Sequence, residues 1–231
     1  IYIVRGEVDI MKKMVMVIMG CLLICFFGGD CVRYFQQQEE SSIDGVQNID
    51  IHNKNIVESN INVSADFENE LSIDEFKNES SDIIKANIIK IDYISYGSVP
   101  WSVLTAKVND TIKGSCKVGQ TIKVYEMGGY IKYSDFKQEY WELPDAQKDS
   151  DLVKIRYFQS KLHEKGEESI FFLNSDITNL PFANIGYQLV GDSFSIMTLD
   201  KRSNKYIEKR NEWNLQENEY EYEEIKEMIE E

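Results

Sequence analysis

Histidine and the motifs that usually carry catalysis are scarce in this 231-residue chain. The two histidines, His52 and His163, stand far apart, and neither has a second imidazole near it in the sequence. His163-Glu164 therefore lacks the second histidine of a zinc-protease helix. Gly128-Gly129 is not followed by the Lys and Ser/Thr of a phosphate loop, and no D-x-[DN]-x-[DN]-G calcium loop occurs. We predict no catalytic residue, no metal ligand and no cofactor, and we expect that the protein is not an enzyme.

Cysteine is also sparse outside the N-terminal segment. Three of the four cysteines lie in the first 31 residues, which leaves Cys116 alone in the body of the chain. No C-x-x-C or Cys/His spacing suited to zinc is present. A single body cysteine excludes an internal disulfide framework. A Cys31–Cys116 bond would require Cys31 to be retained and unmodified.

Basic residues are outnumbered, because 25 Lys and Arg stand against 40 Asp and Glu, for a formal net charge of −15. Nucleic acids and anionic lipid headgroups are bound by clustered Lys and Arg, so neither is an expected ligand. Solubility explains most of the acidity. Acids spread through loops and a C-terminal helix are typical of a solvated face. They leave one enzymatic alternative open, which is a hydrolase that works through paired carboxylates.

The segment that begins at Met11 has the pattern of an export signal. Lys12 and Lys13 form a positive n-region, residues 14–27 are an uninterrupted apolar run, and Gly28-Gly29-Asp30 ends that run. The run is shorter than the roughly 20 residues that span a bilayer comfortably. The lysine pair would stay on the cytoplasmic side by the positive-inside rule. A signal peptide or a short membrane anchor is therefore predicted.

Two cysteines at the end of this leader are candidates for lipid attachment. Ile18-Met19-Gly20-Cys21 resembles a lipobox, but the residues after Cys21 are apolar. Cys31 is followed by polar residues, but the preceding Asp30 is unfavourable in a lipobox. Cys21 or Cys31 is thus the expected lipid site, with an uncleaved anchor as the third alternative. Because no small-x-small cleavage site is visible, we expect tethering to the outer face of the cell membrane rather than free secretion.

Composition divides the chain into four segments. Residues 1–10 are interpreted as an upstream region read through as protein, because their codons can include a purine-rich ribosome-binding run before Met11. Residues 11–30 are the leader. Residues 31–69 are polar, rich in Asn and Asp and without a sustained period, so a disordered linker is predicted. Residues 70–231 are predicted to fold as one domain.

The pattern of this domain predicts a mainly β fold, a small antiparallel OB-like barrel with a short helix at each end. A sandwich is the main alternative. The phase of the first strand changes by one residue at Ile89, which is typical of a bulge. Asn218 can cap a C-terminal helix with Tyr222, Ile225 and Ile229 on one stripe. The strands are expected at 83–96, 104–112, 121–125, 169–173, 185–190, 194–199 and 206–207.

Three short motifs carry a resemblance to known proteins. They are Ser81-Asp82-Ile83-Ile84-x-Ala86-x-Ile88, Asp110-x-Ile112-Lys113-Gly114 and Val118-Gly119-x-x-Ile122-x-Val124. The set resembles uncharacterised exported and lipoprotein-like β-barrel proteins of low-GC Gram-positive bacteria, over roughly residues 70–230. The strand pattern is also similar to the OB-like modules of netrins and tissue metalloproteinase inhibitors. That second resemblance implies architecture only, since the inhibitors act through an N-terminal C-x-C that is absent here.

Aromatic residues around the third strand supply the binding hypothesis. Exposed rings could stack on sugars or grip a peptide, whereas buried rings would only cover the core. We predict a membrane-tethered extracytoplasmic binding or interaction module, with a cell-envelope glycan or protein as partner. An envelope-polysaccharide hydrolase and a structural envelope protein are the alternatives, and the oligomeric state stays open. The candidate ligand-binding aromatics are Tyr96, Trp101, Tyr125, Tyr130, Tyr133, Tyr140 and Trp141.

Overall fold

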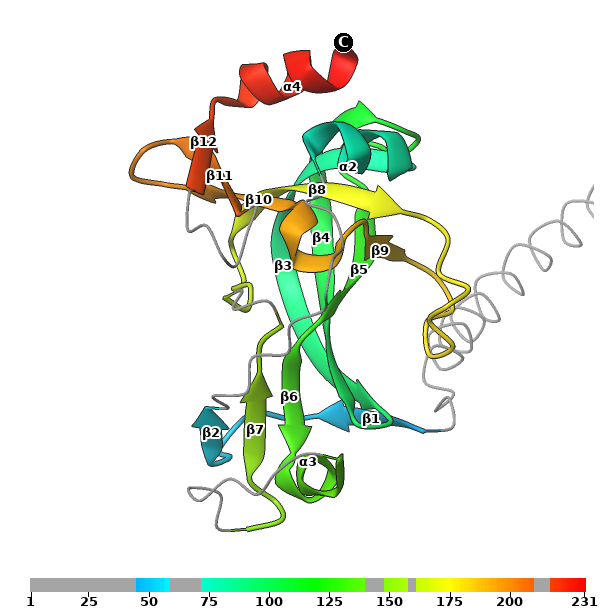
Figure 1. The fold of residues 1–231 in the computed structure, drawn as a ribbon, viewed down its shortest axis with the longest axis vertical. Helices are drawn as coiled ribbons and strands as arrows, with labels where there is room; N and C mark the ends of the chain where they lie inside the picture. The colour runs from blue at the N-terminus through cyan, green and yellow to red at the C-terminus, as the bar shows by residue number, and fades with distance from the viewer. Residues whose placement is uncertain (1–44, 59–71, 140–147, 158–160, 210–216) are drawn as a thin grey trace, which may run out of the picture. The chain divides into compact units, whose positions relative to one another are not determined.

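The computed structural model describes residues 45–58, 72–139, 148–157, 161–209 and 217–231. The predictions for the leader, including both lipid sites, lie outside these residues. The described residues belong to one compact unit, Gly45–Glu231, and are mainly β, as predicted (Figure 1). In those described segments, we find no helix with the length and apolar character needed to cross a bilayer.

The described secondary structure consists of twelve strands, three α-helices and one short 3-10 helix. The strands are β1 (Val46–Ile49), β2 (Ile56–Glu58), β3 (Asp82–Tyr96), β4 (Val99–Lys113), β5 (Thr121–Met127), β6 (Gly129–Lys132), β7 (Leu152–Ile155), β8 (Glu168–Asn174), β9 (Tyr187–Leu189), β10 (Ile196–Asp200), β11 (Lys205–Lys209) and β12 (Glu217–Tyr220). The helices are α2 (Ile73–Glu79), α3 (Tyr133–Glu139), α4 (Tyr222–Glu230) and the 3-10 helix η1 (Asp192–Ser195).

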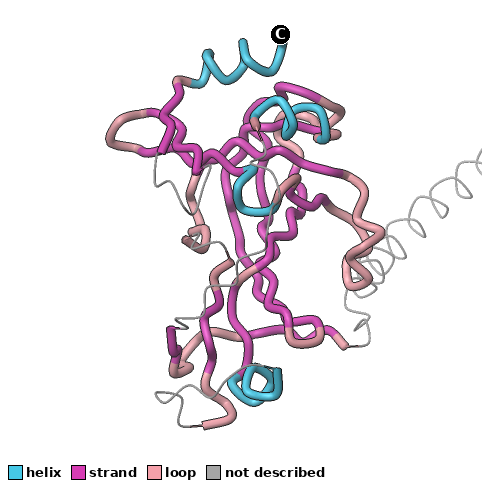
Figure 2. Tube along the Cα trace, in the orientation of Figure 1, coloured by secondary structure: helices cyan, strands magenta, loops and turns pink. Residues whose placement is uncertain are grey.

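Nine of the strands form one sheet in the order β1-β3-β4-β5-β9-β8-β10-β11-β12. In addition, β3 pairs with β8, so that β3, β4, β5, β9 and β8 are linked as a ring of neighbours. Four of these five pairings are antiparallel, and the β5–β9 pairing is parallel. A smaller sheet has the order β2-β7-β6. Figure 2 shows how strands predominate over helices along the trace.

The predicted bulge in the first long strand is confirmed. Ile88 of β3 lies opposite Ala106 and Lys90 lies opposite Thr105, so the pairing skips Ile89. The Ile89 side chain is 39% exposed. On one side of the bulge β3 pairs with β8, and towards its other end it pairs with β1. Since a bulge bends and twists its strand, β3 can pair with two different strands along its length.

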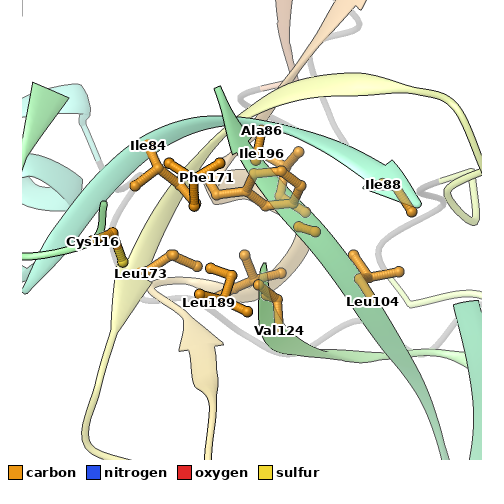
Figure 3. Packing of buried hydrophobic residues seen from close by; sticks show 13 residues of the cluster. Ile84, Ala86, Ile88, Leu104, Cys116, Val124, Phe171, Leu173, Leu189 and Ile196 are labelled. Carbon is orange, nitrogen blue, oxygen red and sulfur yellow. The ribbon is translucent and has the colours of Figure 1, made fainter. Parts of the chain in front are cut away.

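The main hydrophobic core draws side chains from all five strands of the ring (Figure 3). Apolar residues that alternate along the strands are buried, among them Ile84, Ala86 and Ile88 of β3 and Ile122 and Val124 of β5. Phe171 of β8 lies among them and is fully buried. These core residues are Ile84, Ala86, Ile88, Leu104, Ala106, Val108, Cys116, Ile122, Val124, Phe171, Leu173, Leu189 and Ile196.

A second core lies under the two predicted terminal helices. Ile170 and Phe172 of β8 are fully buried in it, alternating with the residues that β8 contributes to the first core. The predicted apolar stripe of the C-terminal helix packs there through Ile225 and Ile229. The expected cap is wrong, because Asn218 lies in β12 and Glu221 is the N-cap of α4. Asn218 was a plausible cap by residue type, but its backbone is committed to pairing with β11.

Residues 46–58, inside the segment expected to be linker, form two strands. β1 pairs antiparallel with β3, and β2 pairs parallel with β7. Ile49 and Val57 are buried. The linker expectation therefore does not hold for this part of residues 31–69. Strands of four and three residues are too short to show a sustained alternation, and their partners lie far along the chain.

Candidate functional site

Three of the predicted binding aromatics meet around a residue that the sequence did not single out. The ring centroid of Phe182 lies 5.2 Å from that of Tyr96, 5.0 Å from that of Trp101 and 5.8 Å from that of Tyr125. Such centroid separations are typical of favourable aromatic contacts. We call Tyr96, Trp101, Tyr125 and Phe182 the Phe182 cluster.

The other predicted aromatics are not members of the Phe182 cluster. Tyr130 of β6 packs edge-on against Tyr93, with the ring centroids 4.7 Å apart. Tyr133 is buried in a separate hydrophobic cluster at α3. Tyr140 and Trp141 lie outside the described residues. The structure thus divides the predicted aromatic set instead of joining it into one surface.

Three chain segments build the Phe182 cluster, and one of them is β5, which carries Tyr125. Tyr96 and Trp101 flank the tight turn that joins β3 to β4. Phe182 comes from residues 175–186, which connect β8 to β9. That connection carries no periodic pattern, and for this reason sequence reasoning missed Phe182. The Leu180 and Ala183 amides donate hydrogen bonds to backbone carbonyls three residues earlier, so the segment is turned back on itself at Phe182.

Gly186 fixes this connection against β5. Its φ is +138°, and a Cβ there would lie 2.8 Å from both the Lys123 carbonyl oxygen and the Tyr125 ring. The Tyr125 hydroxyl also donates to the Ile185 carbonyl, at 3.3 Å. Only glycine combines that backbone angle with so close an approach. The position of Phe182 therefore depends on a glycine four residues later.

We expect Gly186→Ala to lower the free energy of unfolding by about 2 kcal/mol, because the Cβ clashes with backbone and the φ is unfavourable. Gly97→Ala is the matched control. Gly97 also has a positive φ but has nothing within 4 Å of a Cβ, so a cost of about 1 kcal/mol is expected. Urea denaturation of the two variants measures the difference. Equal losses would show that the close approach of Gly186 to β5 contributes nothing.

The cluster has an inner and an outer part. Phe182 and Tyr125 are each only 7% exposed, whereas Tyr96 and Trp101 are half-buried. Ile185, in the same connection, is 64% exposed. Phe182 is therefore a buried anchor, and Tyr96 and Trp101 are the rings that keep a solvent-facing side.

The two segments that carry Tyr96, Trp101 and Phe182 are almost free of charge. Residues 93–106 contain no Asp, Glu, Lys or Arg, and residues 174–188 contain only Asp176, in a chain with 28% charged residues. Asp176 is itself occupied, since its carboxylate accepts from the amide and hydroxyl of Thr178. Amide and hydroxyl side chains supply the remaining polarity of residues 174–188. This chemistry suits an uncharged ligand.

A separate group of titratable side chains involves Glu126, the residue after Tyr125 on β5. The side chain of Glu126 is 1% exposed. His163 lies between two carboxylates, with Nε2 3.6 Å from Glu126 Oε1 and Nδ1 3.1 Å from Glu167 Oε2. The sequence did not indicate Glu126 as a partner of His163, because Glu126 is distant in the chain. In the part of the chain that the structure describes, no three His, Cys, Asp or Glu side chains are grouped so as to hold a metal ion.

The pKa of Glu167 shows the balance of forces in this group. Burial raises the pKa of this carboxyl, but hydrogen bonds from His163 and the Glu164 amide, with the charges of His163 and Lys161, hold the pKa below its usual value. Glu167 therefore stays ionised at neutral pH. Its negative charge is part of the environment that His163 experiences.

Two of the three motifs that carry the resemblance meet around the Asp82 carboxylate. Asp82 Oδ1 accepts from the amides of Ser115 at 2.6 Å and Cys116 at 3.0 Å. A Cβ on Gly114 would lie 2.3 Å from the same oxygen. Ser81 adds a hydroxyl hydrogen bond to Oδ2. Asp82 thus holds the turn that follows β4, and its motif has a structural role.

No family model, curated protein or solved structure matches this chain. The resemblance to exported lipoprotein-like proteins and to netrin-like modules therefore stays a prediction.

Proposed function

We propose that this protein is a membrane-tethered, extracytoplasmic binding module without catalytic activity, and that the Phe182 cluster is its ligand-binding face. The observation that carries the proposal is the meeting of Tyr96, Trp101 and Phe182 on nearly uncharged segments of a strongly acidic chain. Half-buried aromatic rings held by a rigid support are the usual anchors of binding surfaces.

The proposed architecture is an OB-like barrel made of β3, β4, β5, β8 and β9. The ring of pairings among these five strands supports it. In OB-folds, ligands contact strands 2 and 3 and the loops that join strands 1–2 and 4–5. Counted along the chain, the β3–β4 turn and the β8–β9 connection correspond to these two loops, and they contribute Tyr96, Trp101 and Phe182. The aromatic cluster would then occupy the ligand-binding place of the fold.

The ligand that we propose is an uncharged glycan of the cell envelope, with an envelope protein as the alternative partner. Aromatic rings can stack on the apolar faces of sugars, and neutral amides and hydroxyls can bond their hydroxyl groups. A polyanion would be repelled by the net charge of −15. A polycation would find no unoccupied charged group in residues 93–106 or 174–188.

The tether is proposed from Lys12, Lys13 and the apolar run that follows them. Lipid attachment at Cys21 or Cys31 predicts incorporation of labelled palmitate by cells that express the full chain. Cys21→Ala and Cys31→Ala distinguish the two positions, because the label is lost only when the modified cysteine is replaced. Label retained in both single variants and in the double variant would rule out lipid attachment at these cysteines.

We expect Trp101→Ala to weaken binding to neutral envelope polysaccharide about 30-fold, the effect of removing an aromatic anchor worth about 2 kcal/mol. The measurement is isothermal titration of the detergent-solubilised full chain with purified neutral polysaccharide. Val118→Ala is the control, because Val118 is a 67% exposed apolar residue in the β4–β5 connection, outside the Phe182 cluster.

Three results would contradict parts of this proposal. Equal affinity of the Trp101→Ala and Val118→Ala variants would remove the Phe182 cluster as the binding face. Capture of envelope proteins without any glycan would favour the protein partner. Release of reducing ends from the polysaccharide during the titration would favour the hydrolase alternative.

A further inference from the structure

We infer that His163, in its doubly protonated form, fastens the segment 161–167 to the sheet, and that the segment loosens when His163 loses a proton. The inference concerns a conformational device, and it does not depend on the proposed ligand. It rests on the position of the imidazole between Glu126 of β5 and Glu167 of its own segment.

Each ring nitrogen of His163 faces a carboxylate oxygen, one at hydrogen-bond distance and one at ion-pair distance. Nδ1 lies 3.1 Å from Glu167 Oε2, and Nε2 lies 3.6 Å from Glu126 Oε1. A neutral imidazole carries one N–H, so one of its nitrogens would present a lone pair to a carboxylate oxygen. The imidazolium donates from both nitrogens and carries the opposite charge. The observed arrangement therefore suits the charged ring.

The surrounding charges favour the same state. Within the segment, Lys161 pairs with Glu164 at 2.8 Å and with Glu167 at 3.6 Å. The buried carboxylate of Glu126 faces the ring from β5. Lys161 thus pairs with two of the three carboxylates, and a positive charge on the imidazole would face its two contacts, Glu126 and Glu167. Like charges gathered around a ring favour its oppositely charged form.

Tyr93 on the neighbouring strand adds no charge near neutral pH. Tyr93 of β3 interacts with Glu126 and Glu164, and Tyr130 of β6 packs on Tyr93. Burial, followed by the nearby Tyr130, Glu126 and Glu164, raises the pKa of Tyr93 to about 12. The Tyr93 hydroxyl is therefore neutral when His163 titrates.

The fastening holds a short segment against two strands. Leu162 is 8% exposed and would contact a Cβ on Gly128 at 3.3 Å. The Gly166 amide donates to the Ile88 carbonyl at 2.8 Å, and the Ile88 amide donates to the Glu167 carbonyl at 2.9 Å. When His163 becomes neutral, the buried Glu126 carboxylate loses a counter-charge, which is costly at a site with little access to water. Moving the segment outwards lets water reach that carboxylate.

The direction of the pH effect follows from the sign of the charge. A histidine that is charged in its folded position stabilises the structure at pH values below its ordinary range, near 6.5. That stabilisation is lost as the pH rises through the titration midpoint of the folded protein. The segment is thus held at pH values below that midpoint and released above it.

Carbon-detected NMR titration of the two histidines in the detergent-solubilised full chain tests the inference. We expect Glu126→Gln to lower the titration midpoint of His163 by about one pH unit, a tenfold change in its ionisation constant. The signal of His52 is the internal control, because that residue is exposed in the segment between β1 and β2. Hydrogen exchange at the Ile88 and Gly166 amides, corrected for intrinsic rates, should accelerate as His163 loses its proton.

Glu167→Gln is the second variant, and it keeps the test decisive if Glu126→Gln does not fold. It removes the carboxylate on the other side of the ring, from a side chain that is 21% exposed. A His163 midpoint unchanged in the variants that fold would overturn the inference. Exchange protection at Ile88 and Gly166 that stays constant across the His163 midpoint would overturn it as well.

Discussion

Replacement of Asp82 by alanine is expected to lower the free energy of unfolding by about 3 kcal/mol, because two backbone amides lose a charged acceptor. Asp82 is 3% exposed and receives the amides of Ser115 and Cys116 on one oxygen. The variant removes the group that holds the turn after β4 against the start of β3. Chemical denaturation followed by circular dichroism measures the loss.

Asp92→Ala is the matched control for this experiment. Asp92 lies on the same strand, and its carboxylate makes an exposed ion pair with Lys90 at 2.8 Å. Exposed pairs of this kind contribute little, so a change within about 0.5 kcal/mol is expected. A loss in Asp82→Ala no larger than that of Asp92→Ala would contradict the structural role of the motif.

The contribution of Asp82 to the free energy of unfolding is also predicted to depend on pH. Burial raises the pKa of this carboxyl, but the amides of Ser115 and Cys116 and the Ser81 hydroxyl together hold the pKa below its usual value. A lowered folded-state pKa contributes stability above the ordinary Asp value near 4, and that stability is lost as the pH falls through the folded value. The stability of Asp82→Asn should therefore fall less steeply than that of the wild type as the pH is lowered below about 4. Parallel stability curves of the two proteins in this range would be the contrary result.

Phe182→Ala is expected to cost about 3 kcal/mol of stability, the effect of removing a buried aromatic ring. The same change should abolish the proposed ligand binding, because Tyr96 and Trp101 lose the ring that positions them. Loss of near-ultraviolet circular dichroism, with the far-ultraviolet spectrum kept, would locate the change at the aromatic side chains.

Phe182→Leu separates packing from ring-to-ring contact. Leucine keeps most of the apolar volume beside Tyr125, so its stability loss should be less than half that of alanine. If binding also survives in the leucine variant, Phe182 only fills space beneath Tyr96 and Trp101. Full stability in Phe182→Ala would show that the β8–β9 connection does not depend on this anchor.

Much of the strand pattern was predictable from local sequence. The inward positions Ile84, Ala86 and Ile88 were visible because burial of one sheet face imposes a period of two. The bulge at Ile89 was visible as a break in that period. The stripe of Ile225 and Ile229 was visible because a helix that packs on one side repeats about every 3.6 residues. Each of these signals is contained within a few consecutive residues.

The short strands of the smaller sheet were not predictable in the same way. β6 and β7 lie between the strands expected at 121–125 and 169–173, in a stretch where no strand was predicted. β2 pairs with β7 across almost 100 residues of sequence. Three or four residues do not display a period, so their conformation is decided by the partner strand that they find.

The sequence by itself determined the acidic charge, the β-rich fold, the inward faces of the long strands and the candidate aromatics, because each depends on residue type and local spacing. Only the tertiary structure decided that Phe182 joins Tyr96 and Trp101, and that His163 lies between Glu126 and Glu167. The first group depends on the pairing of β3 with β4 and of β5 with β9, and the second places Glu126 of β5 beside a segment that precedes β8. Which strands pair over long range depends on how all of them bury their apolar faces together. A local sequence pattern therefore does not predict the partner of a strand.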